Sequence, residues 1–309
     1  MITKRIAAVV VTRNRKAVLV ESVTRMLAQT HVPDRIFVID NASTDGTREH
    51  LEASGLLRDK RLELVSRDVN DGGAGGFHHG LDLAVGLGYD WIWLMDDDCF
   101  PEVDALEQLL RPLDIANDPI GFICSHVVWR DRTPHVMNLP GIKLRPHGRV
   151  FSEQIGEGVL VVPTCSFVSV LINRAAIEQC GLPLREMFVW GDDLEFTGRI
   201  TRAGYLGYFA FRSVVVHDTR RNANDDLMSA DESEFFKYRY GIRNNLMIIR
   251  RTRGFASYVV ALVEQLTVAN VRLLLGRRQS RLAAVVVNTG ATVRSLFFAP
   301  RVVKPTGHR

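Results

Sequence analysis

Three consecutive carboxylates, Asp96-Asp97-Asp98, stand where an apolar run over residues 91–95 ends. Such a run is typical of a buried strand, so the acids are expected at a strand end. Their charges repel one another unless a cation lies among them, and a divalent ion with oxygen ligands, Mg²⁺ or Mn²⁺, is the usual partner. The alternative is a solvated acidic turn before a helix, which Pro101 is expected to open.

A second acidic cluster begins at Asp192-Asp193, and Glu195 follows three residues after Asp192. We expect a helix over residues 196–203, with Asp192 and Glu195 on one helix face. Acids at a helix N-terminus also stabilise the helix dipole, so simple capping is the alternative role.

Glycine fills four of five positions, Gly72, Gly73, Gly75 and Gly76, before a helix expected at residues 77–85. A backbone of this kind turns tightly and approaches a ligand closely, and the helix N-terminus beyond it can bind an anion. The stretch lacks the lysine of a Walker A loop and does not follow the first strand, as a dinucleotide fingerprint would. A flexible linker is the alternative.

The remaining pattern predicts an α/β fold, because apolar β-branched runs alternate with stretches of helical spacing. Right-handed crossovers then give a mostly parallel sheet, with ligands beyond the carboxyl ends of the strands. Thr12, Asp40 and His217 lie at such ends, and His217 is a candidate metal ligand. We expect strands at residues 6–11, 35–39, 62–65, 91–95, 168–172 and 208–216, a helix at 174–180, and an irregular acceptor-pocket insertion at 122–162 with strands near 124–129 and 158–162.

The composition is that of a globular protein with a sizeable core, since 46% of the 309 residues are hydrophobic and 24% are charged. The four cysteines have no paired spacing and are expected to be reduced thiols, not a disulfide frame or a zinc site. Residues 1–5 lead directly into the first strand and not into a signal peptide. No run of about 18 uncharged apolar residues occurs, so we expect no spanning helix.

Charge is divided unevenly along the chain. Residues 235–309 hold 14 of the 39 lysines and arginines but one of the 35 acids, so they carry +13 and residues 1–234 carry −9. Apolar residues recur there at helical spacing, which predicts a catalytic domain over 1–234 and a basic, amphipathic helical region over 235–309. Nucleic acid, a membrane surface and a pyrophosphate-bearing lipid all suit such a region, and packing within a helical subdomain or an oligomer is the alternative.

Taken in order, the motifs VVVTRNR, VIDNASTDGT, NDGGAGGF, LMDDDCFP, WGDDLEF and VVVHD resemble those of family-2 glycosyltransferases with the GT-A fold, over roughly residues 5–220. The triple aspartate, the doubled glycines and the tryptophan before the paired aspartates resemble the galactofuranosyltransferase branch. Rhamnosyltransferases of the family, which would use dTDP-rhamnose, share much of this pattern. Many members carry Glu-Asp where this chain has Asp192-Asp193, which leaves open which carboxylate is the base.

The resemblance implies donor contacts from the first half of the chain. Thr12, Arg13 and Asp40 would hold uridine, and Asn70 with the glycine stretch would hold nucleotide or sugar. Asp97 is grouped with these contacts, since alternation along an extended segment points it away from its neighbours. The glycines concerned are Gly73, Gly75 and Gly76.

The resemblance also implies the reacting centre. Asp96, Asp98 and His217 would bind Mn²⁺ or Mg²⁺, and Asp193 would be the catalytic base. Asp192 and Trp190 would line the sugar and acceptor site. A metal neutralises the leaving diphosphate, and one base with direct displacement gives inversion of the anomeric carbon.

The implied partners are UDP-galactofuranose and a lipid-pyrophosphate-linked glycan at the inner face of the cell membrane, in cell-wall galactan synthesis, with no nucleic acid. Peripheral attachment through residues 235–309 is expected, and a homo-oligomer is left open. Two other classes compete. A nucleotidyltransferase would be expected to carry a basic residue in the glycine stretch, and a non-catalytic membrane-surface protein would not need both acidic clusters.

Overall fold

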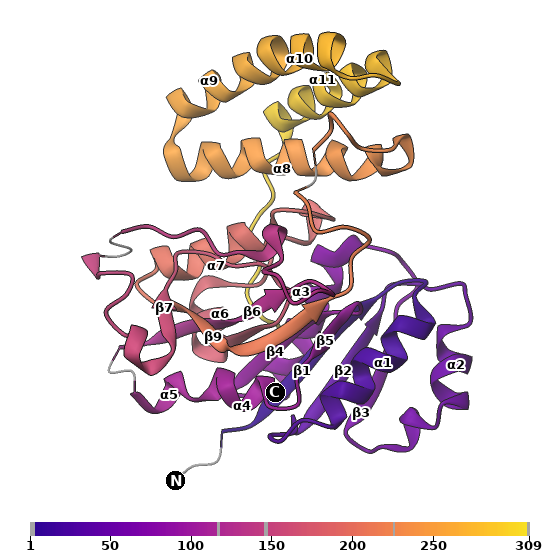
Figure 1. The fold of residues 1–309 in the computed structure, drawn as a ribbon, viewed down its shortest axis with the longest axis vertical. Coiled ribbons are helices and arrows are strands. Elements are labelled where there is room, and N and C mark those ends of the chain that lie inside the picture. Colours follow the sequence, from indigo (N-terminus) through magenta and orange to yellow (C-terminus); the bar gives the residue numbers. More distant parts are fainter. Residues whose placement is uncertain (1–3, 116–117, 145–147, 225, 308–309) are drawn as a thin grey trace.

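A nine-stranded sheet forms the centre of the protein, in the order β3-β2-β1-β4-β8-β6-β9-β5, with β7 paired to β9 (Figure 1). The computed structural model describes residues 4–115, 118–144, 148–224 and 226–307, so residues 1–3 of the expected N-terminal start lie outside it. The strands are β1 (Ile6–Thr12), β2 (Arg35–Asp40), β3 (Leu62–Ser66), β4 (Trp91–Asp96), β5 (Cys99–Pro101), β6 (Ile120–Val128), β7 (Val159–Val161), β8 (Val170–Asn173) and β9 (Leu206–His217).

The α/β prediction is confirmed, but the sheet is mixed and not mostly parallel. Strands β3, β2, β1 and β4 run parallel, as the alternation of strands and helices predicted. Strand β8 is antiparallel to both β4 and β6, and β9 is antiparallel to β5 and β7. Strands β6 and β9 add another parallel pair. The difference arises because the second half of the sheet is not built from simple βαβ repeats.

Helices cover both faces of the sheet, and alternate residues of each strand point to opposite sides. Helices α1, α2 and α4 share one core with Ala8, Val10 and Trp93, while α3, α6 and α7 share the other with Val9 and Leu94. These helices are α1 (Lys16–Leu27), α2 (Thr47–Ala53), α3 (Gly72–Gly86), α4 (Ala105–Leu110), α5 (Pro112–Ile115), α6 (Arg174–Cys180) and α7 (Asp192–Arg202).

The glycine stretch belongs to α3 and is not a loop ahead of it, so the helix begins at Gly72 and not near residue 77. The reason is close packing. A Cβ on Gly76 would lie 2.4 Å from Val11 Cγ1, and one on Gly80 would lie 2.3 Å from Val9 Cγ1. The glycines thus allow α3 to lie directly against β1.

Two further boundaries differ from the sequence prediction. Pro101 ends the short strand β5 and does not open a helix; α4 starts at Ala105. Helix α7 starts at Asp192 and not at residue 196, so both paired aspartates lie in its first turn. All four cysteines are free and buried, as expected.

Residues 235–297 form a layer of helices above the sheet in Figure 1, with α8 between the sheet and the other helices. Buried residues of α8, α10 and α11 form one apolar core with Leu227 and Ala230, whereas Met247 of α8 packs with Ala74, Leu184 and Met187 of the α/β body. The chain then returns to the α/β body, where Val303 O accepts the Leu182 N–H at 2.8 Å and Asp82 accepts from Thr306. The layer consists of α8 (Phe235–Arg253), α9 (Phe255–Glu264), a π-helical turn (Gln265–Ala269), α10 (Asn270–Gly276) and α11 (Arg281–Phe297).

The continuous helical stretch Phe255–Gly276 is long and apolar enough to cross a membrane, by length and composition alone, and it is mostly unburied. Glu264 and Arg272 lie within it, so it contains no uncharged apolar run of about 18 residues. The expectation of no such segment is therefore corrected.

We predict that Gly80→Ala destabilises the protein by about 1–3 kcal/mol, because the added methyl group has no room against Val9. Thermal or urea unfolding followed by circular dichroism measures this. Gly73→Ala is the matched control on the same helix: nothing lies within 4 Å of the position that its Cβ would take, and alanine favours a helix. Equal destabilisation of both variants would contradict the packing explanation.

Candidate active site

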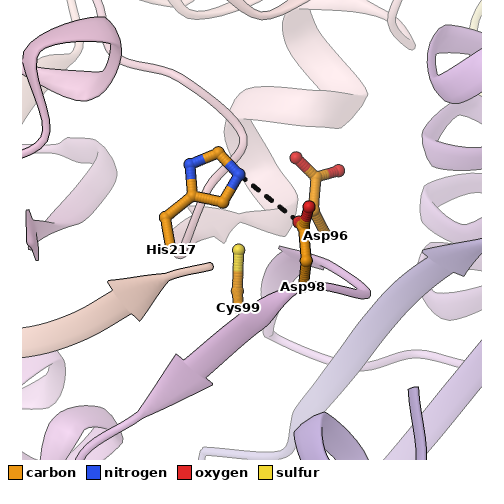
Figure 2. A group of neighbouring side chains, drawn as sticks. All are labelled: Asp96, Asp98, Cys99 and His217. Carbon is orange, nitrogen blue, oxygen red and sulfur yellow. Dashed lines mark ion pairs between the residues drawn. The ribbon is translucent and has the colours of Figure 1, made fainter. Parts of the chain in front are cut away.

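Asp96, Asp98 and His217 meet at the carboxyl ends of β4 and β9, with the thiol of Cys99 beside them (Figure 2). Each residue offers a ligand atom within 4.8 Å of the others, and Asp98 Oδ1 lies 3.3 Å from His217 Nε2. The pairing of β5 with β9 sets this arrangement, because Cys99 lies opposite His217 in register. The predicted metal ligands are thus brought together.

Burial makes the carboxylates costly in the charged form. Burial and the charge of Asp98 raise the pKa of Asp96 to about 7. Burial would also raise the pKa of Asp98, but the hydrogen bond and charge of His217 and the charge of Arg15 lower it to about 2. A divalent cation fits this donor set, since two carboxylate oxygens and one imidazole nitrogen converge. Burial and the neighbouring acids raise the pKa of Cys99, which keeps its thiol protonated and a poor ligand for a hard ion.

Residues of the insertion at 122–162 orient the ring of His217. His217 Nδ1 lies 2.9 Å from Asn138 Oδ1, which can only accept, so Nδ1 carries a proton and donates to it. Nε2 faces Asp98 Oδ1 at 3.3 Å, and in the absence of a cation its N–H supplies the hydrogen bond and charge that lower the pKa of Asp98. A cation bound in place of that proton would be held by the Nε2 lone pair. Asn138 is itself fixed by donating to Ser166 Oγ at 3.0 Å. His135 packs on the His217 ring with centroids 4.7 Å apart.

Asp97 occupies a two-residue turn between β4 and β5, and not the extended segment that the alternation argument assumed. Its carboxylate accepts from Thr12 Oγ1 at 2.7 Å and lies 3.3 Å from Arg15 Nη1, and the Arg13 backbone also donates to it. Arg15 forms a second ion pair with Asp98. Asp97 is therefore outside the metal group, tied to the end of β1.

Asp40 is buried and accepts from the Ser43 N–H at 2.9 Å; its uridine contact stays a prediction. Its neighbour Asn41 lies on the cavity wall instead. Asn41 Nδ2 donates to Gly72 O at 2.6 Å. The buried Oδ1 of Asn41 has no hydrogen-bond partner among the described residues. Asn41 is thus a further candidate for a nucleotide contact.

The glycine stretch divides between the cavity and the core. Asn70 and Gly73 line the cavity with Gly72, whereas Gly75 and Gly76 do not. A Cβ on Gly75 would lie 2.2 Å from Asp71 Cβ, so this glycine, like Gly76, is explained by packing. A direct nucleotide contact from Gly75 or Gly76 finds no support in this geometry.

A strained loop presents the second acidic pair. Phe188 and Trp190 both adopt positive φ angles, 67° and 66°, which costs of order 1–3 kcal/mol each. Asn244 of α8 offsets this cost: its buried Nδ2 lies within 3.1 Å of the carbonyl oxygens of Met187, Val189 and Trp190. A residue of the C-terminal helices therefore holds the loop that leads into Asp192 and Asp193.

Asp192 and Asp193 both lie on the cavity wall, in the first turn of α7. Burial, with the charge of Asp193 added, raises the pKa of Asp192 well above its usual range. Burial also raises the pKa of Asp193, to about 6, opposed by hydrogen bonds from backbone N–H groups. Glu195 does not join them; it forms ion pairs with Arg199 and Arg251. Asp193 is therefore the more readily ionised carboxyl of the pair.

One cavity of about 1910 Å³ connects all of these groups, from Thr12 and the acidic triplet to Trp190 and the paired aspartates. Sequence reasoning missed four residues that shape it: Arg15, Asn41, Asn138 and Asn244. Arg15 and Asn41 stand within the motifs VVVTRNR and VIDNASTDGT, so their place at a strand end was a usable signal. Asn138 and Asn244 come from distant segments, and no local pattern points to them.

The fold is that of the GT-A glycosyltransferases. Two solved structures share the fold: GalNAc-T7 with UDP, GalNAc and Mn²⁺ (TM-score 0.62, 16% identity, 93% of this chain and 54% of that one) and the mannosyltransferase PcManGT from Pyrobaculum calidifontis with GDP-Man and Mn²⁺ (TM-score 0.58, 17% identity, 96% and 88%).

The chain belongs to glycosyl transferase family 2, whose family model matches residues 7–181. It is also similar to galactofuranosyltransferase GlfT1 of Mycolicibacterium smegmatis, with 30% identity over 65% of this chain and 67% of that protein. The recognition of the family from its motifs is therefore confirmed.

We predict that Asp96→Ala and Asp98→Ala each abolish metal-dependent binding of UDP, because each removes a charged ligand of the cation. Calorimetric titration of UDP with and without Mn²⁺ measures this. Asp68→Ala, an exposed carboxylate outside this cavity, is the control and should bind as the wild type does. Normal Mn²⁺-dependent affinity in both triplet variants would refute the metal site.

Proposed function

We propose that the protein is an inverting, metal-dependent galactofuranosyltransferase, moving galactofuranose from UDP-galactofuranose to a lipid-pyrophosphate-linked glycan. The observation that carries this is the placement of two separate acidic groups on one cavity, a cation-binding cluster and a pair of aspartates in the first turn of α7. The similarity to proteins named galactofuranosyltransferase supports the donor sugar. A rhamnosyltransferase using dTDP-rhamnose is the nearest alternative.

Each group of cavity residues has its own role in the proposed reaction. When bound, Mn²⁺ or Mg²⁺ neutralises the diphosphate leaving group. Asp96, Asp98 and His217 hold it, and Asn138 fixes the imidazole tautomer. Thr12, Arg13 and Asn41, which line the same cavity, contact the nucleotide in this proposal. Asp193 accepts the proton of the acceptor hydroxyl as that oxygen attacks the anomeric carbon, and Trp190 lines the sugar and acceptor site.

We predict that Asp193→Asn retains donor binding but lowers kcat by on the order of 10²-fold or more, because the amide cannot accept a proton. In the wild type, kcat/KM should fall below about pH 6, since protonation of Asp193 at its raised pKa removes the base; an ordinary aspartate would place that fall near pH 4. Asp192→Asn is the paired variant. If it is the inactive one and Asp193→Asn turns over normally, the assignment of the base is wrong.

The proposed reaction is tested with purified full-length protein, a synthetic lipid-pyrophosphate glycan and each of two donors, UDP-galactofuranose and dTDP-rhamnose. We expect transfer from UDP-galactofuranose alone, abolished by EDTA and restored by Mn²⁺, with mass spectrometry of the product as the readout. Preference for dTDP-rhamnose would favour the alternative. Absence of transfer from any nucleotide sugar would favour the non-catalytic membrane-surface protein.

We also propose that the helical layer attaches the enzyme to the inner face of the cell membrane. Helices α9, α10 and α11 lie on the far side of α8 from the sheet (Figure 1). They expose many large apolar side chains, and exposed apolar patches commonly mark sites of interaction with proteins or membranes. Basic residues accompany them, and each contributes about 1 kcal/mol near an anionic surface. Examples of the exposed apolar side chains are Phe255, Val260, Val263, Leu275, Leu282, Val286 and Phe297.

Attachment along the surface agrees better with the contacts of Phe255–Gly276 than a crossing does. Asn288 of α11 donates to Gln265 O at 2.8 Å and to Asn270 Oδ1 at 2.9 Å. Asn270 in turn donates to Thr289 Oγ1 at 2.9 Å. If Phe255–Gly276 left α11 to cross a membrane, these hydrogen bonds would break. The free-energy cost of the unpaired polar groups would be larger in the bilayer core than in water.

We predict that the full chain co-sediments with anionic liposomes and is released at high salt without detergent. The triple variant Val260→Gln, Leu275→Gln and Phe297→Gln should bind at least tenfold more weakly, because it loses apolar insertion. A matched triple, Val69→Gln, Leu87→Gln and Leu144→Gln, removes exposed apolar side chains of the α/β body and should bind normally. Release only by detergent would indicate a spanning helix, and no liposome binding together with a dimer in solution would indicate an oligomer contact.

A further inference from the structure

The cavity wall contributed by the helical layer is basic. Lys237, Arg239 and Arg243 of α8 and Arg294 of α11 all line the cavity that holds the acidic clusters. Lys237 lies 3.6 Å from Glu234, which partly neutralises it, and Asp231 also reaches this wall. Within the described ranges, no carboxylate lies in ion-pair distance of Arg239, Arg243 or Arg294.

Arg243 is held rigidly with part of its guanidinium free. Its Nη2 donates to Glu186 O at 2.8 Å and to Asn244 Oδ1 at 2.8 Å, and the group stacks 3.6 Å from the centre of the Phe298 ring. Burial lowers the pKa of Arg243, Tyr240 opposes this, and the charge of Arg294 lowers it further. Two like charges close together without a counter-charge repel one another, so an anion between them would be bound favourably.

This basic wall comes from other elements than the group proposed to take the donor diphosphate. The cation cluster stands at the ends of β4 and β9, whereas Arg243 and Arg294 come from the C-terminal helices. Aromatic side chains lie beside the basic wall: Tyr240 stacks on Phe188 with centroids 4.5 Å apart, and both line the cavity. An anion held by the arginines would therefore be a second one, carried by the other substrate.

We infer that Arg243 and Arg294, with Lys237 and Arg239, bind a phosphate or diphosphate group attached to the acceptor glycan. The inference rests on the proposed function for the identity of the acceptor. The planar guanidinium forks suit phosphate oxygens, and the unpaired Arg239 and Arg294 can move to meet them. Membrane phospholipid headgroups offer the same chemistry, so the test separates the two sources.

The test compares two soluble acceptors, a short-chain alkyl diphosphate glycan and the same glycan as a neutral alkyl glycoside. Arg294→Gln and the double variant Arg239→Gln, Arg294→Gln remove charge without removing any hydrogen bond found among the described residues. We expect KM for the diphosphate acceptor to rise about tenfold in the double variant, with kcat, donor KM and KM for the neutral glycoside within twofold of wild type. Arg253→Gln, exposed on α8 and outside the cavity, is the matched control and should match wild type.

A binding assay separates this inference from the proposed reaction. Calorimetry with an alkyl diphosphate that lacks a sugar should show binding to wild type in EDTA that the double variant loses. With Mn²⁺ and saturating UDP present, the wild type should still bind the alkyl diphosphate, because UDP does not displace it. That result without any galactofuranose transfer would keep the anion site and refute the proposed function. An equal rise in KM for both acceptors, an unchanged KM for the diphosphate acceptor, or displacement by UDP would overturn the anion site. Loss of anionic liposome binding with unchanged kinetics would assign the arginines to membrane phospholipid and overturn it as well.

Discussion

The structure depends on keeping several carboxylates close together inside a cavity wall. Asp96, Asp97 and Asp98 stand at one strand end, where burial and mutual repulsion raise the pKa of the first two. Arg15 and His217 offset part of that cost by pairing with the triplet. A cation bound among these carboxylates would remove the remaining repulsion, so the cluster is suited to the metal-dependent reaction that we propose.

The packing of helices and strands around the cavity positions these carboxylates. Close packing of α3 on β1, through Gly76 and Gly80, lets the cavity open directly above the parallel strands. The antiparallel strands then bring His217 back to face the triplet, because β5 pairs with β9. The C-terminal helices complete the opposite wall: Asn244 holds the strained loop before the paired aspartates. These helices are therefore part of the cavity wall, and a cut near residue 234 would disturb the cavity.

Acidic and basic side chains occupy different parts of the cavity wall. The cavity has an acidic end, which suits a cation and the donor diphosphate, and a basic wall from α8 and α11, which suits an anionic acceptor. The same helices expose an apolar outer surface. This division of charge and apolar surface is consistent with the lipid-linked acceptor and the surface attachment that we propose.

The sequence alone determined what local pattern can encode. Buried β-branched runs specified the parallel strands, and short motifs at their ends identified the family and most of the named residues that line the cavity, since those features depend on neighbours in the chain. The sequence also identified a basic, helical C-terminus. Only the tertiary structure decided that the second half of the sheet is mixed, that the glycines serve helix packing, and that Pro101 ends a strand. It alone brought Asn138 to His217 and Asn244 to Trp190, because side chains 79 and 54 positions apart meet only through long-range packing, which leaves no periodic trace in the sequence.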